Sequence, residues 1–160
     1  MLGEEVSSTV ERRSQSHSLI QELIVTRNQM LALYSELASC KPFDQLDEGT
    51  SGILQEFCET LVDYTLQAHL NVYRHIEEKL EKRKQVLQLA EQIYPSILRT
   101  TEIISSFNDA YEEINDHLDA SHLEQNLSKL GEALAERIEF EDQLIAVLTN
   151  KVPGARSLNS

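Results

Sequence analysis

The sequence contains no tryptophan, only 3 prolines and only 5 glycines, whereas leucine, isoleucine and glutamate are abundant. This composition favours an all-helical protein over a sheet protein. A length of 160 residues is enough for one domain with a sizeable core. We expect a single domain over residues 1–150 and a flexible C-terminal tail over residues 151–160.

Positive charge is scarce as well, because 14 Lys and Arg stand against 27 Asp and Glu, a formal net charge of −13. An acidic surface repels phosphate backbones, so direct nucleic-acid binding is not expected, whereas a basic protein surface would be attracted. The alternative explanation of the acidic composition is that it only keeps the protein soluble.

Long apolar runs are absent too. None approaches the roughly 18 residues that span a membrane, and the polar N-terminus lacks the apolar stretch of an export signal. We therefore expect a cytoplasmic protein, without membrane contact and monomeric when free. Cys40 and Cys58 have no metal-binding spacing, and free thiols are expected for them. No glycine-rich phosphate loop occurs, so no cofactor or enzymatic activity is predicted.

Apolar residues recur with helical spacing over four long segments. The first helix is firm from Ser16 to Ser39 and should end before Pro42. Its start is open, because Ser8–Glu11 and Ser18–Gln21 both fit a capping box. Residues 41–51 are typical of a loop, with Thr50 or Ser51 as the cap of a second helix that runs from about Gly52 to Glu81.

The third helical pattern contains Pro95, which should kink or break it, and closes at His117–Ala120. Ser121–Glu124 matches a capping box that opens the fourth helix. Four amphipathic helices with short connections fold most simply as an antiparallel four-helix bundle.

Charged residues interrupt the apolar faces of these helices. Arg27 falls at a core angle on the first helix, His69 at the core edge of the second, and Glu141 within about 40° of the core direction of the fourth. A buried charge needs a partner, so these residues are expected to form a polar network, with Tyr64 or Tyr73 nearby. The alternative is that each side chain reaches water at a helix edge. A second alternative function, a metal-binding protein or enzyme of the helical-bundle type, would use His69 and Glu141.

The outer face of the second helix predicts a contact surface. Glu59, Asp63, Leu66 and Leu70 fall opposite the core face, and folding does not require two leucines there. Scattered surface leucines are also ordinary, so this pattern alone does not identify a site.

Two sequence blocks resemble a known family. Phe57–Tyr73 matches F-C-x-x-L-V-D-Y-x-x-x-x-H-x-x-x-Y, and Gly131–Arg137 with Glu141–Ile145 matches G-E-A-L-x-x-R…E-D-x-L-I. Both are similar to the Rsd/AlgQ family of bacterial anti-sigma factors, in the same order and at the family's spacing. The likeness covers about Leu19 to Leu148.

This resemblance implies a function. Members of the family bind region 4 of the housekeeping, sigma-70-type subunit of RNA polymerase, a basic helix-turn-helix domain that reads the −35 promoter element and docks on the core enzyme. Sequestering it would favour alternative sigma factors as growth slows, without any chemical step. Among the family's functional positions, Asp63 is carried over from the matching L-V-D-Y. Tyr64 is included in the implied partner-binding set with Glu59, Asp63, Leu66 and Leu70.

Overall fold

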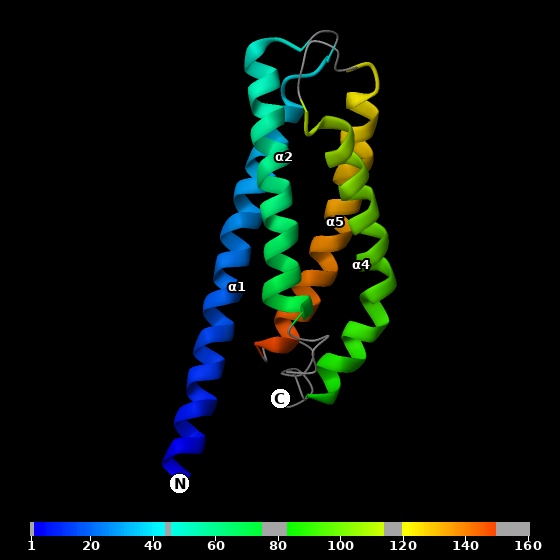
Figure 1. Cartoon of the computed structure of the whole chain (residues 1–160). Coiled ribbons are helices and arrows are strands. Elements are labelled where there is room, and N and C mark those ends of the chain that lie inside the picture. Colours follow the sequence, from blue (N-terminus) through cyan, green and yellow to red (C-terminus); the bar gives the residue numbers. More distant parts are fainter. Residues whose placement is uncertain (1, 44–45, 75–82, 114–119, 150–160) are drawn as a thin grey trace, which may run out of the picture.

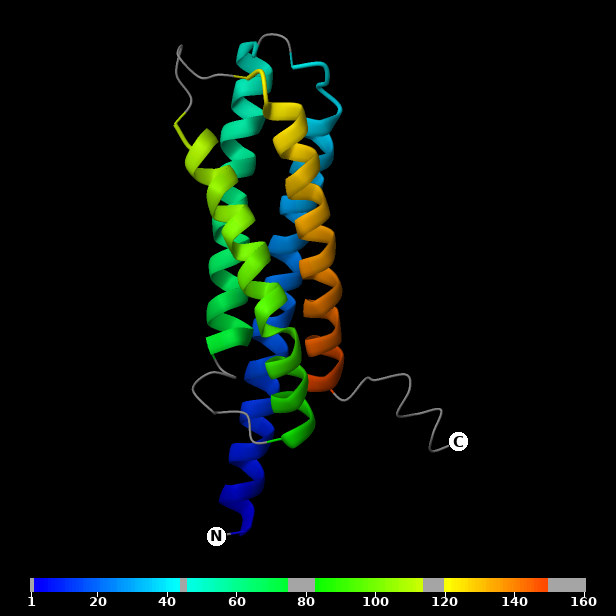
Figure 2. The same ribbon diagram turned by 90° about the vertical axis from the view of Figure 1, so that its right-hand side faces the viewer.

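The computed structural model describes residues 2–43, 46–74, 83–113 and 120–149, and every regular element in these ranges is helical. The elements are α1 (Leu2–Ala38), α2 (Glu48–Ala68), η1 (His69–Tyr73), α4 (Lys84–Tyr111) and α5 (Leu123–Leu148). They run alternately up and down (Figure 1, Figure 2). Helix α1 packs along α2, α4 along α5, and α2 against α4. The predicted all-α, antiparallel four-helix bundle is thus confirmed.

Helix α1 is longer than the sequence predicted. It begins at Leu2, ahead of both candidate capping boxes, and its N-terminal part extends past the ends of the other helices (Figure 2). It ends at Ala38, ahead of Pro42, as expected from the bias of residues before a proline against helical geometry.

Helix α2 begins at Glu48, earlier than predicted, and its N-terminal cap is a different residue from the two that were predicted. Asp47, rather than Thr50 or Ser51, is the N-cap, and its carboxylate accepts a 2.6 Å hydrogen bond from the backbone N–H of Thr50. This bond satisfies a donor that the first turn of a helix leaves free. The predicted end at Glu81 lies outside the described residues, which stop at Arg74 in this region.

Pro95 does not break α4, which continues as one bowed ribbon from Lys84 to Tyr111 (Figure 1). Proline removes one backbone donor and crowds the preceding turn. Ile93 and Ile97, on either side of it, are buried in the core and hold both halves of the helix against the bundle. The predicted closure at His117–Ala120 falls largely outside the described residues.

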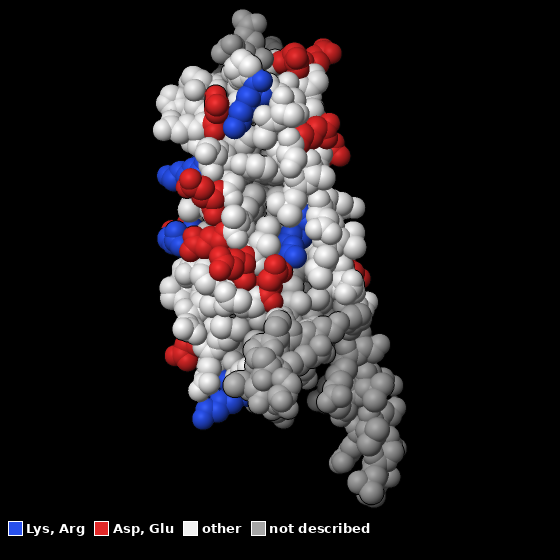
Figure 3. All heavy atoms as spheres, turned by 180° about the vertical axis from the view of Figure 1, so that it is seen from behind, with Lys and Arg blue, Asp and Glu red and all other residues white. Residues whose placement is uncertain are grey.

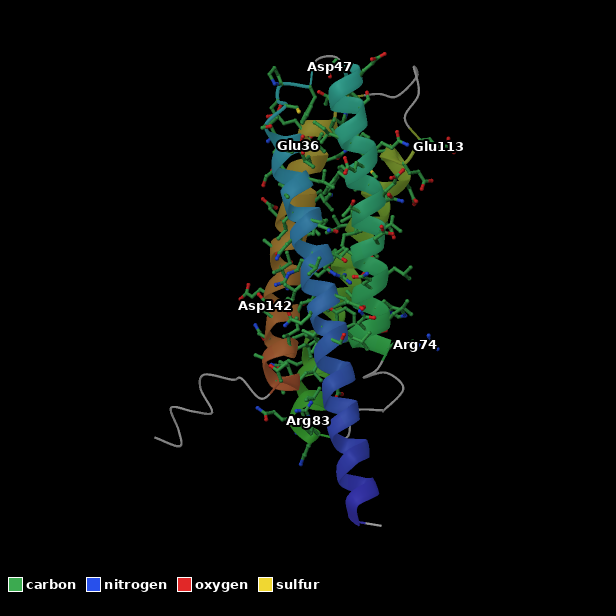
Figure 4. All side chains as sticks on the ribbon, turned by 90° about the vertical axis from the view of Figure 1, so that its left-hand side faces the viewer. Glu36, Asp47, Arg74, Arg83, Glu113 and Asp142 are labelled. Atoms are coloured by element: carbon green, nitrogen blue, oxygen red, sulfur yellow. The ribbon has the colours of Figure 1, made fainter. Side chains whose placement is uncertain are left out.

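The ends of α5 are capped differently from the prediction. Its N-cap is His122, which makes no side-chain capping bond, so the capping box does not form. At the other end, Arg83 donates to the carbonyl oxygens of Val147 (3.3 Å) and Leu148 (2.9 Å). Figure 4 shows Arg83 at this end of the bundle. A cation there satisfies terminal carbonyls and complements the helix dipole. The predicted tail, residues 151–160, lies outside the described part.

One hydrophobic core joins the four helices and includes residues of α1 from Leu23 onward. At one end it holds edge-to-face ring contacts that join Tyr34 to Phe57 and Phe57 to Phe107. Cys58 is a free, buried thiol near the carbonyl of Tyr111, and burial raises its pKa to about 12. In the described part of the chain, no helix has an apolar stretch long enough to cross a membrane.

Candidate functional site: a buried carboxylate and an exposed acidic helix face

Glu141 lies at the centre of a polar cluster inside the bundle, where its side chain is 1% exposed. The hydroxyl of Tyr64 donates to Oε1 at 2.7 Å, and the hydroxyl of Tyr73 donates to Oε2 at 3.3 Å. Arg137 donates through Nε to Oε2 at 3.3 Å, and Arg27 Nη1 lies 3.6 Å from Oε1. Three helices and η1 therefore converge on one carboxyl group.

Arg137 is the member of this cluster that the sequence analysis missed. It is 2% exposed, and its Nη1 also donates to the hydroxyls of Thr101 (2.8 Å) and Thr100 (3.3 Å) on α4. Its guanidinium lies 6.0 Å from the ring centroid of Tyr64 and 5.6 Å from that of Tyr73. These contacts give the buried cation both hydrogen-bond acceptors and aromatic faces.

A signal for Arg137 was present in the pattern of α5. The residue follows Leu134 by three and precedes Glu141 by four, which is the spacing of a core face. The prediction instead continued that face through Ile138, which is only partly buried. The core stripe passes through Arg137, Glu141 and Leu144, and charged residues occupy two of its positions.

The π-helical segment η1 explains how Tyr73 enters the cluster. Nine residues of regular α-helix rotate the chain by about 900°, which would place Tyr73 opposite Tyr64. In η1 the N–H of Arg74 bonds instead to the carbonyl of His69, five residues back, so each residue turns the chain less. Both Val72 and Tyr73 are buried as a result.

Arg27 has two carboxylate partners. Besides Glu141, its Nη1 donates to Asp142 Oδ1 at 2.8 Å. Asp142 lies on the outer side of α5, away from the bundle axis (Figure 4). Arg27 thus connects the buried carboxylate to the surface.

Burial dominates the electrostatics of the cluster. It raises the pKa of Glu141 above the usual value, although the hydrogen bond from Tyr64 and the charges of Arg137 and Arg27 act in the opposite direction. Burial, and then the nearby Glu141, raise the pKa of both Tyr64 and Tyr73, so these hydroxyls stay protonated as donors.

His69 does not join this cluster, because its side chain is exposed. The alternative function required His69 and Glu141 in one site, and the structure does not bring them together. Among the described residues, no group of three or more His, Cys, Asp or Glu side chains could hold a metal ion.

The outer face of α2 and η1 is exposed as the periodicity predicted. Glu59 and Asp63 are exposed, and the exposed fractions of Leu66 and Leu70 are 54% and 44%. Tyr64, which the resemblance placed in the partner-binding set, is fully buried and bound to Glu141, so it cannot touch a partner.

This face carries mostly negative charge. Between Glu48 and Tyr73 the chain has four acidic residues and no Lys or Arg: Glu48, Glu56, Glu59 and Asp63. The opposite side of the molecule differs, since Lys and Arg lie there among Asp and Glu (Figure 3). The exposed face of α2 and η1 therefore combines leucines with mostly negative charge, and the basic Arg74 follows at its end. This combination suits a basic partner with an apolar contact.

Comparisons with known proteins agree with the resemblance. Residues 1–149 match the family described as "Regulator of RNA polymerase sigma(70) subunit, Rsd/AlgQ". The chain is 32% identical over 158 residues to the Regulator of sigma D of Salmonella typhi, covering 95% of each chain. It is 32% identical over 148 residues to that of Enterobacter sp. (strain 638), covering 89% of this chain and 87% of the relative. The chain belongs to the Rsd/AlgQ family of regulators of the RNA polymerase sigma(70) subunit.

Proposed function

We propose that this protein is an anti-sigma factor that sequesters a sigma-70-type subunit by binding its region 4 through the outer face of α2. Binding would prevent region 4 from reading the −35 element and from docking on the core polymerase. The protein would act in the cytoplasm, without a chemical step, and would favour alternative sigma factors in slow growth or stationary phase.

The observation that carries this proposal is the pair of exposed leucines, Leu66 of α2 and Leu70 of η1, on a segment that contains acidic residues and no Lys or Arg before Arg74. The basic charge of a DNA-reading region 4 complements that face. Opposite charges speed the encounter of two proteins, while buried apolar anchors supply most of the affinity. Family membership supports the choice of a sigma factor as the partner.

The test is a calorimetric titration of purified region 4 with the full-length protein. Asp63→Ala should weaken binding by about 1–3 kcal/mol, as the loss of a charged hydrogen bond does. Leu70→Asp should weaken it further, because it places a charge in the apolar contact. Affinity should fall as salt is raised, since exposed charges are screened.

Glu139→Ala is the matched control, because Glu139 is an exposed acid on α5 and its removal changes the net charge equally. It should bind as the wild type does. Equal affinities of wild type, Asp63→Ala and Leu70→Asp would remove the face from the interface. No binding by the wild type would end the assignment to region 4.

A further inference from the structure

Two more large apolar side chains are exposed on the helix beside α2. The exposed fractions of Tyr94 and Leu98 on α4 are 44% and 47%. They are four residues apart and therefore lie on the same side of α4. Leu66 of α2 and Leu70 of η1 are exposed as well. The core positions of this stretch are already filled by Ile93 and Ile97, so the bundle does not need Tyr94 or Leu98 for its packing.

Tyr94 and Leu98 lie on the side of α4 that is turned toward α2. Arg99 forms an ion pair with Glu136 of α5 and so marks the opposite side of the helix. Thr101 accepts a hydrogen bond from Arg137. The guanidinium of Arg137 lies against the rings of Tyr64 and Tyr73, so Thr101 marks the side of α4 that faces α2 and η1. By helical rotation Tyr94 falls within about 20° of Thr101, and Leu98 about 60° farther toward solvent.

The exposed residues on the two helices overlap in level at Leu70 and Leu98. Cys58 Sγ lies 3.8 Å from the carbonyl oxygen of Tyr111, which fixes the relative heights of the antiparallel α2 and α4. Twelve residues along each helix from this contact, Leu70 is level with Arg99 and so beside Leu98. Neighbouring helix axes lie about 8–10 Å apart. Leu70 and Leu98 are thus neighbours, with Leu66 toward one end and Tyr94 toward the other, and we call these four exposed residues the α2–α4 surface.

The charges beside this surface are mostly negative, apart from Arg74, which follows η1 and by the same count is level with Pro95. Exposed acids flank it on both helices: Glu59, Asp63, Glu91 and Glu102. Helix α4 carries two basic residues, Lys84 at its first position and Arg99 on the side that faces α5. The α2–α4 surface is thus apolar, with acids on both flanks and Arg74 at the end near Tyr94.

We propose that the α2–α4 surface as a whole receives one amphipathic helix of the sigma factor, whose apolar stripe is flanked by Lys or Arg. Two parallel rows of apolar side chains on adjacent helices offer the seat that a third helix requires. This inference rests on the proposed function and extends it, because Tyr94 and Leu98 of α4 become partner-contacting residues.

The test measures the affinity of the full-length protein for purified sigma region 4 by calorimetry. Leu98→Asp and Tyr94→Asp should each raise Kd by at least about tenfold, as expected when a charge enters a central apolar contact. Their helical circular dichroism and urea midpoints should match the wild type. Val25→Asp is the matched control, because Val25 is 55% exposed on α1 and gains the same charge. Its Kd should stay within about twofold.

Leu66→Asp on α2 separates the two proposals. If it weakens binding while Leu98→Asp and Tyr94→Asp do not, the contact is confined to α2, and the inference is overturned while the proposed function stands. Equal weakening by Val25→Asp would attribute the effect to net charge and would also overturn it. Absence of binding by the wild type overturns both. Should Leu98→Asp fail to fold, Leu98→Ala replaces it, with an expected rise in Kd of about three- to tenfold.

Discussion

Tyr64 and Tyr73 are nine residues apart in the chain, yet their hydroxyls donate to the two different oxygens of the Glu141 carboxylate. The π-helical turn between them brings both side chains to the same side of the chain. The carboxylate in turn holds Arg137, which binds both threonines of α4. A single buried ion pair thus fixes how the helices are aligned with one another.

The two tyrosine hydroxyls should contribute unequally to stability. Tyr64→Phe should lower the free energy of unfolding by about 1.5–3 kcal/mol, as expected for a hydrogen bond to a charged group. Tyr73→Phe should lower it less, because its bond is 3.3 Å rather than 2.7 Å. Urea unfolding measures both, with the exposed Tyr94→Phe as control. Losses no larger than that of the control would mean that the hydroxyls are not needed by Glu141.

Removing the carboxylate itself should cost more. Glu141→Ala should lower the free energy of unfolding by about 3 kcal/mol or more, because it leaves Arg137 buried without its counter-charge. Asp142→Ala is the control, since it removes only a surface partner of Arg27, worth about 0–1 kcal/mol. A loss near zero for Glu141→Ala would show that the carboxyl group does not stabilise the core. Combining Arg137→Leu with Glu141→Leu should cost less than the sum of the two single changes.

Gly131 is required by its close approach to Tyr34. A Cβ atom added at Gly131 would lie 2.9 Å from Cζ of Tyr34, whose hydroxyl donates to the carbonyl of Leu127. Gly131→Ala should therefore destabilise the protein by about 1–3 kcal/mol, despite the higher helix propensity of alanine.

The matched control for this change is Gly52→Ala on α2, where an added Cβ meets nothing within 4 Å. It should stabilise the protein by about 0.5–1 kcal/mol. Thermal unfolding of both variants compares the two sites directly. If both variants were more stable than the wild type, Tyr34 would move away from residue 131 without any loss of stability, and the prediction would be wrong.

The Asp47 cap predicts a pH dependence of stability. Hydrogen bonds from Thr50 lower the pKa of Asp47 below its ordinary value of 3.8. A depressed folded-state pKa contributes stability that is fully present above the unfolded-state pKa and is lost as the pH falls through the folded-state pKa. The stability difference between wild type and Asp47→Ala should therefore shrink below about pH 3.8.

Asp47→Asn keeps a capping acceptor but does not titrate. Its stability relative to Asp47→Ala should stay constant over the same pH range, as followed by urea unfolding at each pH. If the stability difference between wild type and Asp47→Ala were also constant over this pH range, the ionised form of Asp47 would not strengthen the cap.

The sequence was informative wherever a property depends on spacing along one helix. The exposure of Asp63, Leu66 and Leu70 follows from their distance in residues from Leu61 and Ala68, and the structure places them accordingly. The burial of Glu141 was also predicted from its angle on α5. The predicted start of α2 was wrong, because several residues before Gly52 can cap a helix. Only the backbone conformation at Asp47 selects among them.

The sequence by itself determined the helical class, the four amphipathic segments and the acidic outer face of α2, because each depends on composition or on a 3.6-residue period. The tertiary structure alone decided which helices meet around Glu141. Tyr73 enters the core because of a π-helical turn that the hydrophobic periodicity did not predict, and the side chain of His69 is exposed outside the cluster. Arg137 has the spacing of a core residue on α5, but the threonines and tyrosines that surround its guanidinium come from other helices. A buried charge is stable only where such partners converge, and that convergence is a property of packing between segments far apart in the chain.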